Sequence, residues 1–287
     1  MIRPVVLSLL PLLGAAVSSA EGPVVALANV QYGQAEGAPL RLDLCVPPGK
    51  GPFAGVILVH GGGWAAGDKQ KDPRPLLAPL TSAGFAWFSI NYRLAPQYHY
   101  PACLDDVYTA IRWVKAHAAE YGVDPHRLAL VGESAGGHLV EMAALEGPPD
   151  TKVEAVVPFF GPADLMAQAT GREGSLRRDL RTLFGRTTLD DQTREILRDA
   201  SPVNHVHGGL PPFLIFHGTA DRVVPYSESV AFAEKLKAAG DSCDFISIAG
   251  GSHAMGNWSR VAPGFKEQFV SWLQRTLAPK PAVVAAR

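Results

Sequence analysis

A serine flanked by glycines places the strongest constraint on how this chain can fold. The stretch Gly132-Glu133-Ser134-Ala135-Gly136 follows the apolar run 127–131 and leads into the helix-forming residues 139–145. An apolar run that ends in Gly-x-Ser-x-Gly before such residues predicts a strand, a sharp turn and a helix. Small residues are needed at both ends of the motif, where strand and helix would otherwise collide. We expect Ser134 to stand exposed at the start of a helix, although an ordinary glycine-rich turn also fits.

The composition is that of an ordinary globular protein. The 287 residues are 47% hydrophobic and 18% charged, enough for one large domain with a full core. The formal net charge is -1, whereas binding to phosphate backbones calls for a basic excess. The sequence therefore indicates no nucleic-acid partner.

The first 20 residues differ from the rest of the chain. Arg3 is the only early charge, residues 5–17 are apolar, and Ser18-Ser19-Ala20 has the small residues of a cleavage site. This pattern predicts a signal peptide over 1–20, a mature chain from about Glu21 and a secreted or periplasmic protein. Because the apolar run is short for a bilayer, stable membrane insertion is the weaker alternative.

The three cysteines, Cys45, Cys103 and Cys243, show neither Cys-x-x-Cys nor metal-ligand spacing. At least one of them must be unpaired. We expect all three to be small, buried apolar side chains.

Extended runs and helical patterns alternate along the chain. The first two runs predict a hairpin, and the third is apolar without interruption, as in a strand covered on both faces. The alternation predicts a mostly parallel sheet with helices on both faces. In the helix expected over 101–119, one face would carry Leu104, Val107, Ile111 and Val114. The expected strands are 24–30, 40–46, 54–60, 85–90, 128–131, 153–160, 213–217 and 243–248, and the other helices are 226–239 and 264–277.

A long polar and charged segment, 161–209, interrupts this alternation. Segments of that length between two core strands are usually functional insertions. We expect a helical cap over the site, with a solvated excursion as the open alternative. The remaining chain forms a single domain over 21–278, followed by a flexible tail at 279–287.

Chemistry in such sheets collects beyond the carboxyl ends of the strands, and three further motifs lie there. His60-Gly61-Gly62-Gly63-Trp64 follows the third run, and its glycines let backbone N–H groups approach a ligand closely. We expect Gly62 and Gly63 to be oxyanion donors, together with Ala135 at the positive end of the helix after Ser134. A phosphate-binding loop is the competing interpretation, but the Lys and Ser or Thr of that motif are missing.

A carboxylate follows the next-to-last strand at Asp221, where it can accept a hydrogen bond from an imidazole. The alternative is a turn or helix cap before Pro225. Asp164 and Asp244 are rivals of the same type in less suitable places. We expect His217, at the end of the strand, to be structural.

A histidine, His253, lies in a glycine loop after the last strand. From such a loop it can reach Ser134 and act first as general base and then as general acid. The order serine, aspartate, histidine along the chain is that of the α/β-hydrolase fold. A lone histidine in a loop is usually only a surface residue, so the joint pattern carries the prediction.

At these residues the sequence resembles the α/β-hydrolase superfamily, and within it the hormone-sensitive-lipase-like esterases and bacterial acetyl or feruloyl esterases. The resemblance covers essentially the whole mature chain. It rests on His60-Gly61-Gly62-Gly63-Trp64, Asn91-Tyr92-Arg93-Leu94-Ala95-Pro96, Gly132-Glu133-Ser134-Ala135-Gly136-Gly137, His217-Gly218 with Asp221 and Pro225, and His253.

The resemblance implies an α/β-hydrolase fold with an eight-stranded sheet, in which Ser134 is the nucleophile, His253 the base and Asp221 the orienting acid. It also implies Gly62, Gly63 and Ala135 as oxyanion donors, and neither metal nor cofactor. Many lipase relatives carry Asp before the nucleophile. Glu133 at that position is more similar to the acetyl and feruloyl esterase group.

The resulting hypothesis is a serine carboxylic ester hydrolase that forms an acyl-enzyme from short-chain or aromatic acyl esters, such as acetyl or feruloyl groups of plant carbohydrate. Four apolar side chains would either wall the acyl pocket or belong to the core: Trp64, Tyr92, Phe160 and Leu165. An amidase or exopeptidase of the same fold is the first alternative. A non-catalytic binding protein is the second, although such proteins usually lack one member of the triad.

Overall fold

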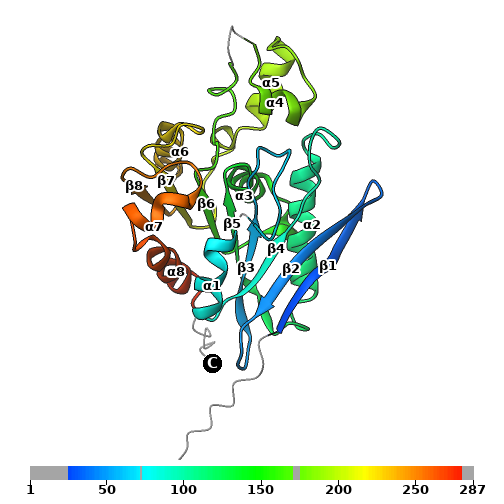
Figure 1. Cartoon of the computed structure of the whole chain (residues 1–287), viewed down its shortest axis with the longest axis vertical. Coiled ribbons are helices and arrows are strands. Elements are labelled where there is room, and N and C mark those ends of the chain that lie inside the picture. Colours follow the sequence, from blue (N-terminus) through cyan, green and yellow to red (C-terminus); the bar gives the residue numbers. More distant parts are fainter. Residues whose placement is uncertain (1–24, 72, 171–174, 280–287) are drawn as a thin grey trace, which may run out of the picture.

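The computed structural model describes residues 25–71, 73–170 and 175–279. The predicted signal peptide (1–20) and nearly all of the predicted tail (279–287) lie outside the described residues. The described chain contains an eight-stranded sheet in the order β1-β2-β4-β3-β5-β6-β7-β8 (Figure 1). The strands are β1 (Val25–Ala35), β2 (Ala38–Val46), β3 (Phe53–Val59), β4 (Ala86–Ile90), β5 (Val123–Glu133), β6 (Ala155–Phe159), β7 (Phe213–Gly218) and β8 (Cys243–Ile248).

The sheet is mostly parallel, as predicted. β1 and β2 form the expected hairpin, which turns at Glu36 and Gly37 with positive φ at both residues. β2 also pairs antiparallel with β4, whereas every pair from β4 onward is parallel. The parallel strands therefore point their carboxyl ends to one edge of the sheet, where loop residues from distant parts of the chain can meet.

Helices cover both faces of this sheet (Figure 1). α2, α3 and α6 pack on one face, while α1, α7 and α8 pack on the other. The helices of the sheet domain are α1 (Arg74–Ser82), α2 (Ala102–Ala116), α3 (Ala135–Glu146), α6 (Tyr226–Ala238), α7 (Trp258–Val261) and α8 (Phe265–Thr276).

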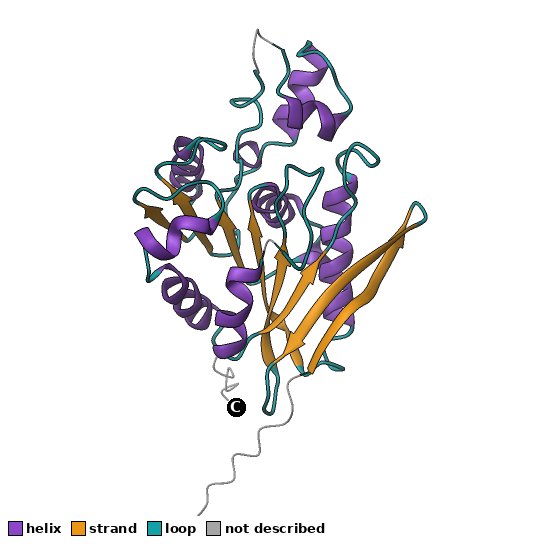
Figure 2. Cartoon of the chain, viewed as in Figure 1, coloured by secondary structure: helices purple, strands orange, loops and turns teal. Residues whose placement is uncertain are grey.

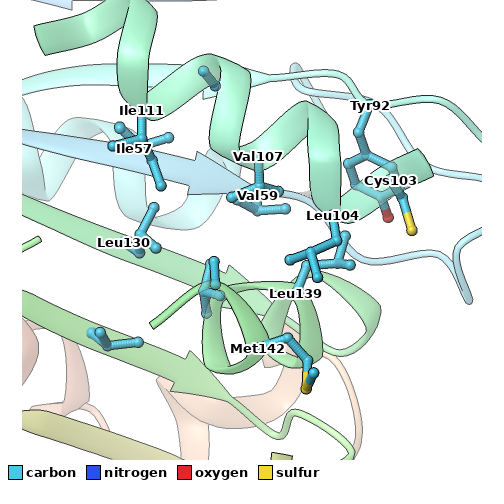
Figure 3. Close-up of a cluster of buried hydrophobic side chains, with 14 of the residues drawn as sticks. Ile57, Val59, Tyr92, Cys103, Leu104, Val107, Ile111, Leu130, Leu139 and Met142 are labelled. Carbon is cyan, nitrogen blue, oxygen red and sulfur yellow. The ribbon is translucent and has the colours of Figure 1, made fainter. Parts of the chain in front are cut away.

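The central strand β3 shows how the two cores divide. Ile57 and Val59 point into the core under α2 and α3, where Val107 and Ile111 also lie (Figure 3). Val56 and its alternate neighbours point into the opposite core. Since successive strand residues face opposite sides, a strand covered on both faces must be apolar throughout. The four α2 residues predicted to share a face are all buried.

The sequence pattern misses α1 and the short α7, and it places the start of β5 too late. α1 was not expected because Pro75 and Pro79 interrupt its sequence; the buried side chains of Leu76 and Leu80 still fix it against α8 and the sheet. β5 starts at Val123, well before the predicted residue 128. Val123 is buried, but residues 124–127 are partly or fully exposed, so the apolar run marks only the continuously buried half of the strand.

Cys45, Cys103 and Cys243 are buried and free, as predicted. Burial raises the pKa of the Cys103 thiol to about 12, which keeps it protonated and unreactive. Among the residues that the structure describes, no helix has both the length and the apolar character needed to cross a membrane.

The segment 161–209 contributes two short helices, α4 (Arg178–Phe184) and α5 (Asp191–Asp199). Both lie beyond the carboxyl ends of the central strands (Figure 2). Asp190 caps α5, because its Oδ1 accepts a hydrogen bond from the Thr193 N–H at 2.8 Å. We refer to 161–209 as the cap segment.

Candidate active site

Ser134 sits in the sharp turn between β5 and α3. Its backbone has φ 52° and ψ −119°, a conformation that residues other than glycine rarely adopt. The Ser134 N–H donates to the carbonyl oxygen of Phe159 in β6 at 2.9 Å, which ties the turn to the sheet. A Cβ atom on Gly132 would collide with the backbone of Gly136, and one on Gly136 would collide with Val59. The glycines are thus required by the close approach of β3, β5 and α3.

The three side chains singled out by their order in the sequence meet beside this turn. His253 Nε2 lies 2.9 Å from Ser134 Oγ, and His253 Nδ1 lies 2.7 Å from Asp221 Oδ2. An ionised carboxylate can only accept, so Nδ1 carries the proton and Nε2 is left to accept from the serine hydroxyl. In this arrangement the imidazole can remove the hydroxyl proton of Ser134.

Asp221 is prepared to remain ionised. Burial alone would raise its pKa, but hydrogen bonds from His217, His253 and the Val223 N–H outweigh burial and hold the pKa below its usual range. Its Oδ1 accepts from the N–H groups of Val223 and Val224 at 2.8 and 3.0 Å. Asp221 therefore forms the turn before Pro225 that was the alternative prediction, and it contacts His253 at the same time.

His217 contributes more than the purely structural part expected from sequence. Its Nε2 lies 3.3 Å from Asp221 Oδ2 and 3.1 Å from the Val224 carbonyl, while its Nδ1 lies 2.7 Å from Ser229 Oγ. The ring is fully buried. It fixes the Asp221 loop against α6, so that the carboxylate faces His253.

The rival carboxylates serve elsewhere. Asp164 Oδ1 accepts from the Ala167 N–H at 2.9 Å within a local turn. Asp244 Oδ2 accepts from the indole of Trp272 at 2.8 Å, on the edge strand β8. Neither carboxylate is placed to orient His253.

The glycine loop 60–64 passes directly beside the serine. A Cβ on Gly61 would lie 3.3 Å from Ser134 Cβ, so this position must remain small. Gly62 and Gly63 have φ of 106° and 59°. Within the described parts of the chain, the N–H groups of these two glycines have no hydrogen-bond acceptor. Two backbone donors therefore remain available close to Ser134, as the N–H of Ala135 does at the first turn of α3.

Buried aromatic residues hold that loop in place. The Trp64 indole N–H donates to His138 Nδ1 at 3.2 Å. The Tyr92 hydroxyl donates to the His60 carbonyl at 3.1 Å, and its ring stacks on the His60 ring at 4.3 Å. Phe160 packs against the His253 ring at 4.7 Å.

The four residues proposed either for the acyl pocket or for the core are buried. Trp64, Tyr92, Phe160 and Leu165 expose 4% of their surface or less. Trp64, Tyr92 and Phe160 support the glycine loop and the histidine, whereas the Leu165 N–H donates to Ser201 Oγ at 2.9 Å in the cap segment. The sequence could not distinguish the two roles, because large apolar residues at strand ends fit both.

His138, four residues after the serine on α3, joins three parts of the site. Besides the Trp64 contact, its Nε2 donates to the Ala200 carbonyl of the cap segment at 2.7 Å. Burial lowers the pKa of His138 to about 4, partly opposed by the hydrogen bond to Ala200. The neutral ring therefore acts as a fixed link between the glycine loop, α3 and the cap segment.

A second buried polar group lies one turn further along α3. Glu141 is fully buried, and neither of its carboxyl oxygens has a hydrogen-bond partner among the described residues. Burial, reinforced by the nearby Glu228, raises its pKa well above the usual value. Burial likewise raises the pKa of Glu228 to about 7, against hydrogen bonds from Gln168 and the Asp164 N–H. Burial without a partner therefore favours the protonated form of the Glu141 carboxyl.

Sequence patterns could not identify this carboxyl pair, because Glu141 on α3 and Glu228 on α6 come near each other only in the folded chain. Among the described residues there is also no group of three or more His, Cys, Asp or Glu side chains that could hold a metal ion.

Comparisons with known proteins agree with this geometry. The BD-FAE family profile matches residues 42–236, which is more than half of the chain. The sequence is 35% identical over 195 residues to a probable carboxylic ester hydrolase, LipM, of Mycobacterium tuberculosis. That match covers 63% of this chain and 44% of LipM. The chain spans about half the length of the curated relatives LipM, LipC and LipQ.

Solved structures extend the similarity over nearly the whole described fold. A truncated carbohydrate esterase from gut microbiota superposes with a TM-score of 0.77 at 27% identity, covering 91% of this chain and 99% of the other. An esterase of Thermogutta terrifontis with bound propionate superposes with a TM-score of 0.71 at 30% identity. That match covers 88% of this chain and 96% of the esterase. The predicted α/β-hydrolase fold is confirmed.

Proposed function

Because this chain belongs to the BD-FAE family, we propose that it is a serine carboxylic ester hydrolase that works through an acyl-enzyme. The single observation that carries the proposal is the unbroken hydrogen-bond chain from Ser134 through His253 to Asp221. Serine hydrolases require a nucleophile, a base and an orienting carboxylate in this order of contact.

In the proposed mechanism, Ser134 Oγ attacks the ester carbonyl carbon while its proton passes to His253 Nε2. Asp221 stabilises the imidazolium without taking the proton. The imidazolium then protonates the departing alcohol, which leaves the acyl group on the serine. Water attacks this ester with His253 as base, the acid is released, and the serine hydroxyl is restored.

The negative charge on the carbonyl oxygen is stabilised by backbone donors. We assign this role to the N–H groups of Gly62, Gly63 and Ala135, which surround the serine from the glycine loop and from the start of α3. Preorganised donors of this kind typically contribute about 3 to 4 kcal/mol each to transition-state stabilisation.

The proposed substrates are short-chain or aromatic acyl esters, including acetyl or feruloyl groups of plant carbohydrate. Three observations support this class. The family designation denotes a bifunctional acetyl/feruloyl esterase, one structural neighbour is a carbohydrate esterase, and another binds propionate.

Replacement of Ser134 by Ala tests the activity. We expect hydrolysis of nitrophenyl acetate to fall by at least about a thousandfold, with circular dichroism unchanged. Ser259→Ala, at an exposed serine of α7, is the matched control and should retain activity. Fluorophosphonate should label the wild type and not the Ser134 variant.

Full activity of the Ser134 variant would overturn the assignment. Turnover of acetyl, butyryl and feruloyl esters, each compared with the matched anilide, then measures the acyl preference. A preference for the anilide would favour the amidase alternative.

We also propose that the protein is exported, on the strength of the signal-like pattern over residues 1–20. The first residue of protein recovered from its native host should then lie near Glu21. An N-terminus at Met1 would refute export by a cleaved signal.

A further inference from the structure

A basic cleft lies on the cap segment. Arg178, Arg181 and Arg186 line it from α4 and the turn after it, and Pro96 and His99 line it from the segment that follows β4. Its volume is about 440 Å³. No acidic residue is among those that line it. In a chain of formal net charge -1, this is a pronounced local excess of positive charge.

The positive charge of the cleft is not neutralised by ion pairs. Within the described ranges, none of these three guanidinium groups forms a salt bridge. The neighbouring Arg177 is different, because it pairs with Asp179 at 2.5 Å. The carboxylate of Asp190 interacts electrostatically with Arg186, but Asp190 caps α5 and does not line the cleft. Unpaired guanidinium groups that share one cleft favour an anionic ligand.

The cleft and the proposed active site lie on two sides of the same helix. A Cβ on Gly63 would lie 4.0 Å from Asp179 Cβ, so the first turn of α4 touches the glycine loop. The Tyr100 N–H donates to the Leu183 carbonyl at 3.0 Å and fixes the last turn of α4 beside the segment that follows β4. With seven residues, α4 is only about 10 Å long. A polymer whose ester is bound at Ser134 can thus also place part of its chain in the cleft.

We propose that this cleft binds the carboxylate groups of an acidic polysaccharide that carries the ester, an inference that rests on the proposed function. The cleft lies on the side of α4 that faces away from the glycine loop, so we assign the anionic groups to the carrier chain and not to the acyl group on Ser134. A carbohydrate whose sugar residues bear carboxylates presents such groups at regular intervals beside its esterified hydroxyls. Arginine binds carboxylates with two parallel hydrogen bonds, which suits this partner.

The test compares one acidic and one neutral polymer. The double variant Arg178→Glu, Arg181→Glu reverses the charge at two exposed positions of the cleft. Arg198→Glu, at an exposed arginine of α5 outside the cleft, is the control. The substrates are O-acetylated polygalacturonate, O-acetylated neutral xylan and nitrophenyl acetate.

We expect the double variant to lose about tenfold or more in kcat/KM on acetylated polygalacturonate, since several exposed charge contacts are lost together. Turnover of acetylated xylan and of nitrophenyl acetate should stay unchanged in both variants. Raised salt should reduce the wild-type preference for the acidic polymer.

An unchanged ratio between the two polymers in the double variant would overturn the inference. So would an equal loss in the Arg198 control. Either result leaves the esterase proposal intact, because that proposal depends on the loss of nitrophenyl acetate turnover in the Ser134 variant. If dextran sulfate competes with the acidic substrate and free polygalacturonate does not, the cleft is not a carboxylate site and the inference also fails.

Discussion

The buried His138 makes a strong prediction for the pH dependence of stability. Its pKa is lowered to about 4 in the folded protein, whereas an unfolded histidine titrates near 6.5. Between these values the unfolded chain binds a proton that the folded chain does not. Lowering the pH through this range therefore favours unfolding.

The size of the effect follows from the two pKa values. At pH 5 the unfolded histidine is mostly protonated and the folded one is mostly neutral, which costs about 2 kcal/mol of folding free energy relative to pH 7. Below pH 4 the loss approaches about 3 kcal/mol and then stays constant. This is a considerable share of the 5 to 15 kcal/mol that typically stabilise a domain.

His138→Gln provides the perturbation. The amide offers one donor and one acceptor to replace the bonds with Ala200 and Trp64, and it does not titrate in this range. The free energy of unfolding, measured by urea titration at pH 7 and at pH 5, should fall by about 2 kcal/mol less in the variant than in the wild type.

His126→Gln, at an exposed histidine, is the control substitution. If the wild type and the His138 variant lose the same stability between pH 7 and pH 5, His138 is not the neutral buried link described above.

Two further predictions concern the carboxylates. Asp221→Asn should lower kcat on nitrophenyl acetate by about a thousandfold or more, because an amide at this position no longer favours the imidazole tautomer that accepts from Ser134; near-normal kcat with His253 still required would contradict this. Burial raises the pKa of Glu228 to about 7, and the charged or titratable groups around it are Glu141, Asp164 and Arg177. Between pH 4.5 and 7 the folded chain therefore holds a proton that the unfolded chain does not. Burial of Glu228 thus weakens stability above pH 7, and this penalty disappears as the pH falls toward 4.5. Glu228→Gln should therefore be more stable than the wild type at pH 8 by about 1 to 3 kcal/mol in urea unfolding, with most of this gain lost at pH 5. An equal gain at both pH values would refute the raised pKa.

The elbow and the three-residue hydrogen-bond chain could be anticipated from the sequence because local sterics and strand order determine them. The backbones approach so closely at positions 132 and 136 that only glycine fits, and this requirement can be recognised in the sequence as the Gly-x-Ser-x-Gly pattern. The carboxyl ends of parallel strands meet at one edge, so residues that follow β5, β7 and β8 are brought together whatever their separation along the chain.

The supporting residues could not be anticipated, because their positions depend on packing between elements. His138 directly follows the serine motif, yet its contacts come from the glycine loop and the cap segment. The approach of His217 to Asp221 depends on how the loop after β7 folds back on α6. In both cases the sequence does not distinguish a histidine that supports the site from one that is merely buried in the core.

Helix α3 links these observations, since its polar residues follow a single stripe. Ser134, His138 and Glu141 are spaced by four and three residues and therefore share one face of the helix. The first contacts His253, the second joins the glycine loop to the cap segment, and the third approaches Gly161 and Glu228. Buried polar groups on an otherwise apolar helix weaken folding unless they are satisfied. Ser134 and His138 have hydrogen-bond partners, so within this stripe only Glu141, whose oxygens have none among the described residues, lowers stability. Because all three contacts share one rigid element, a displacement of α3 would disturb the nucleophile, the oxyanion donors and the cap segment together.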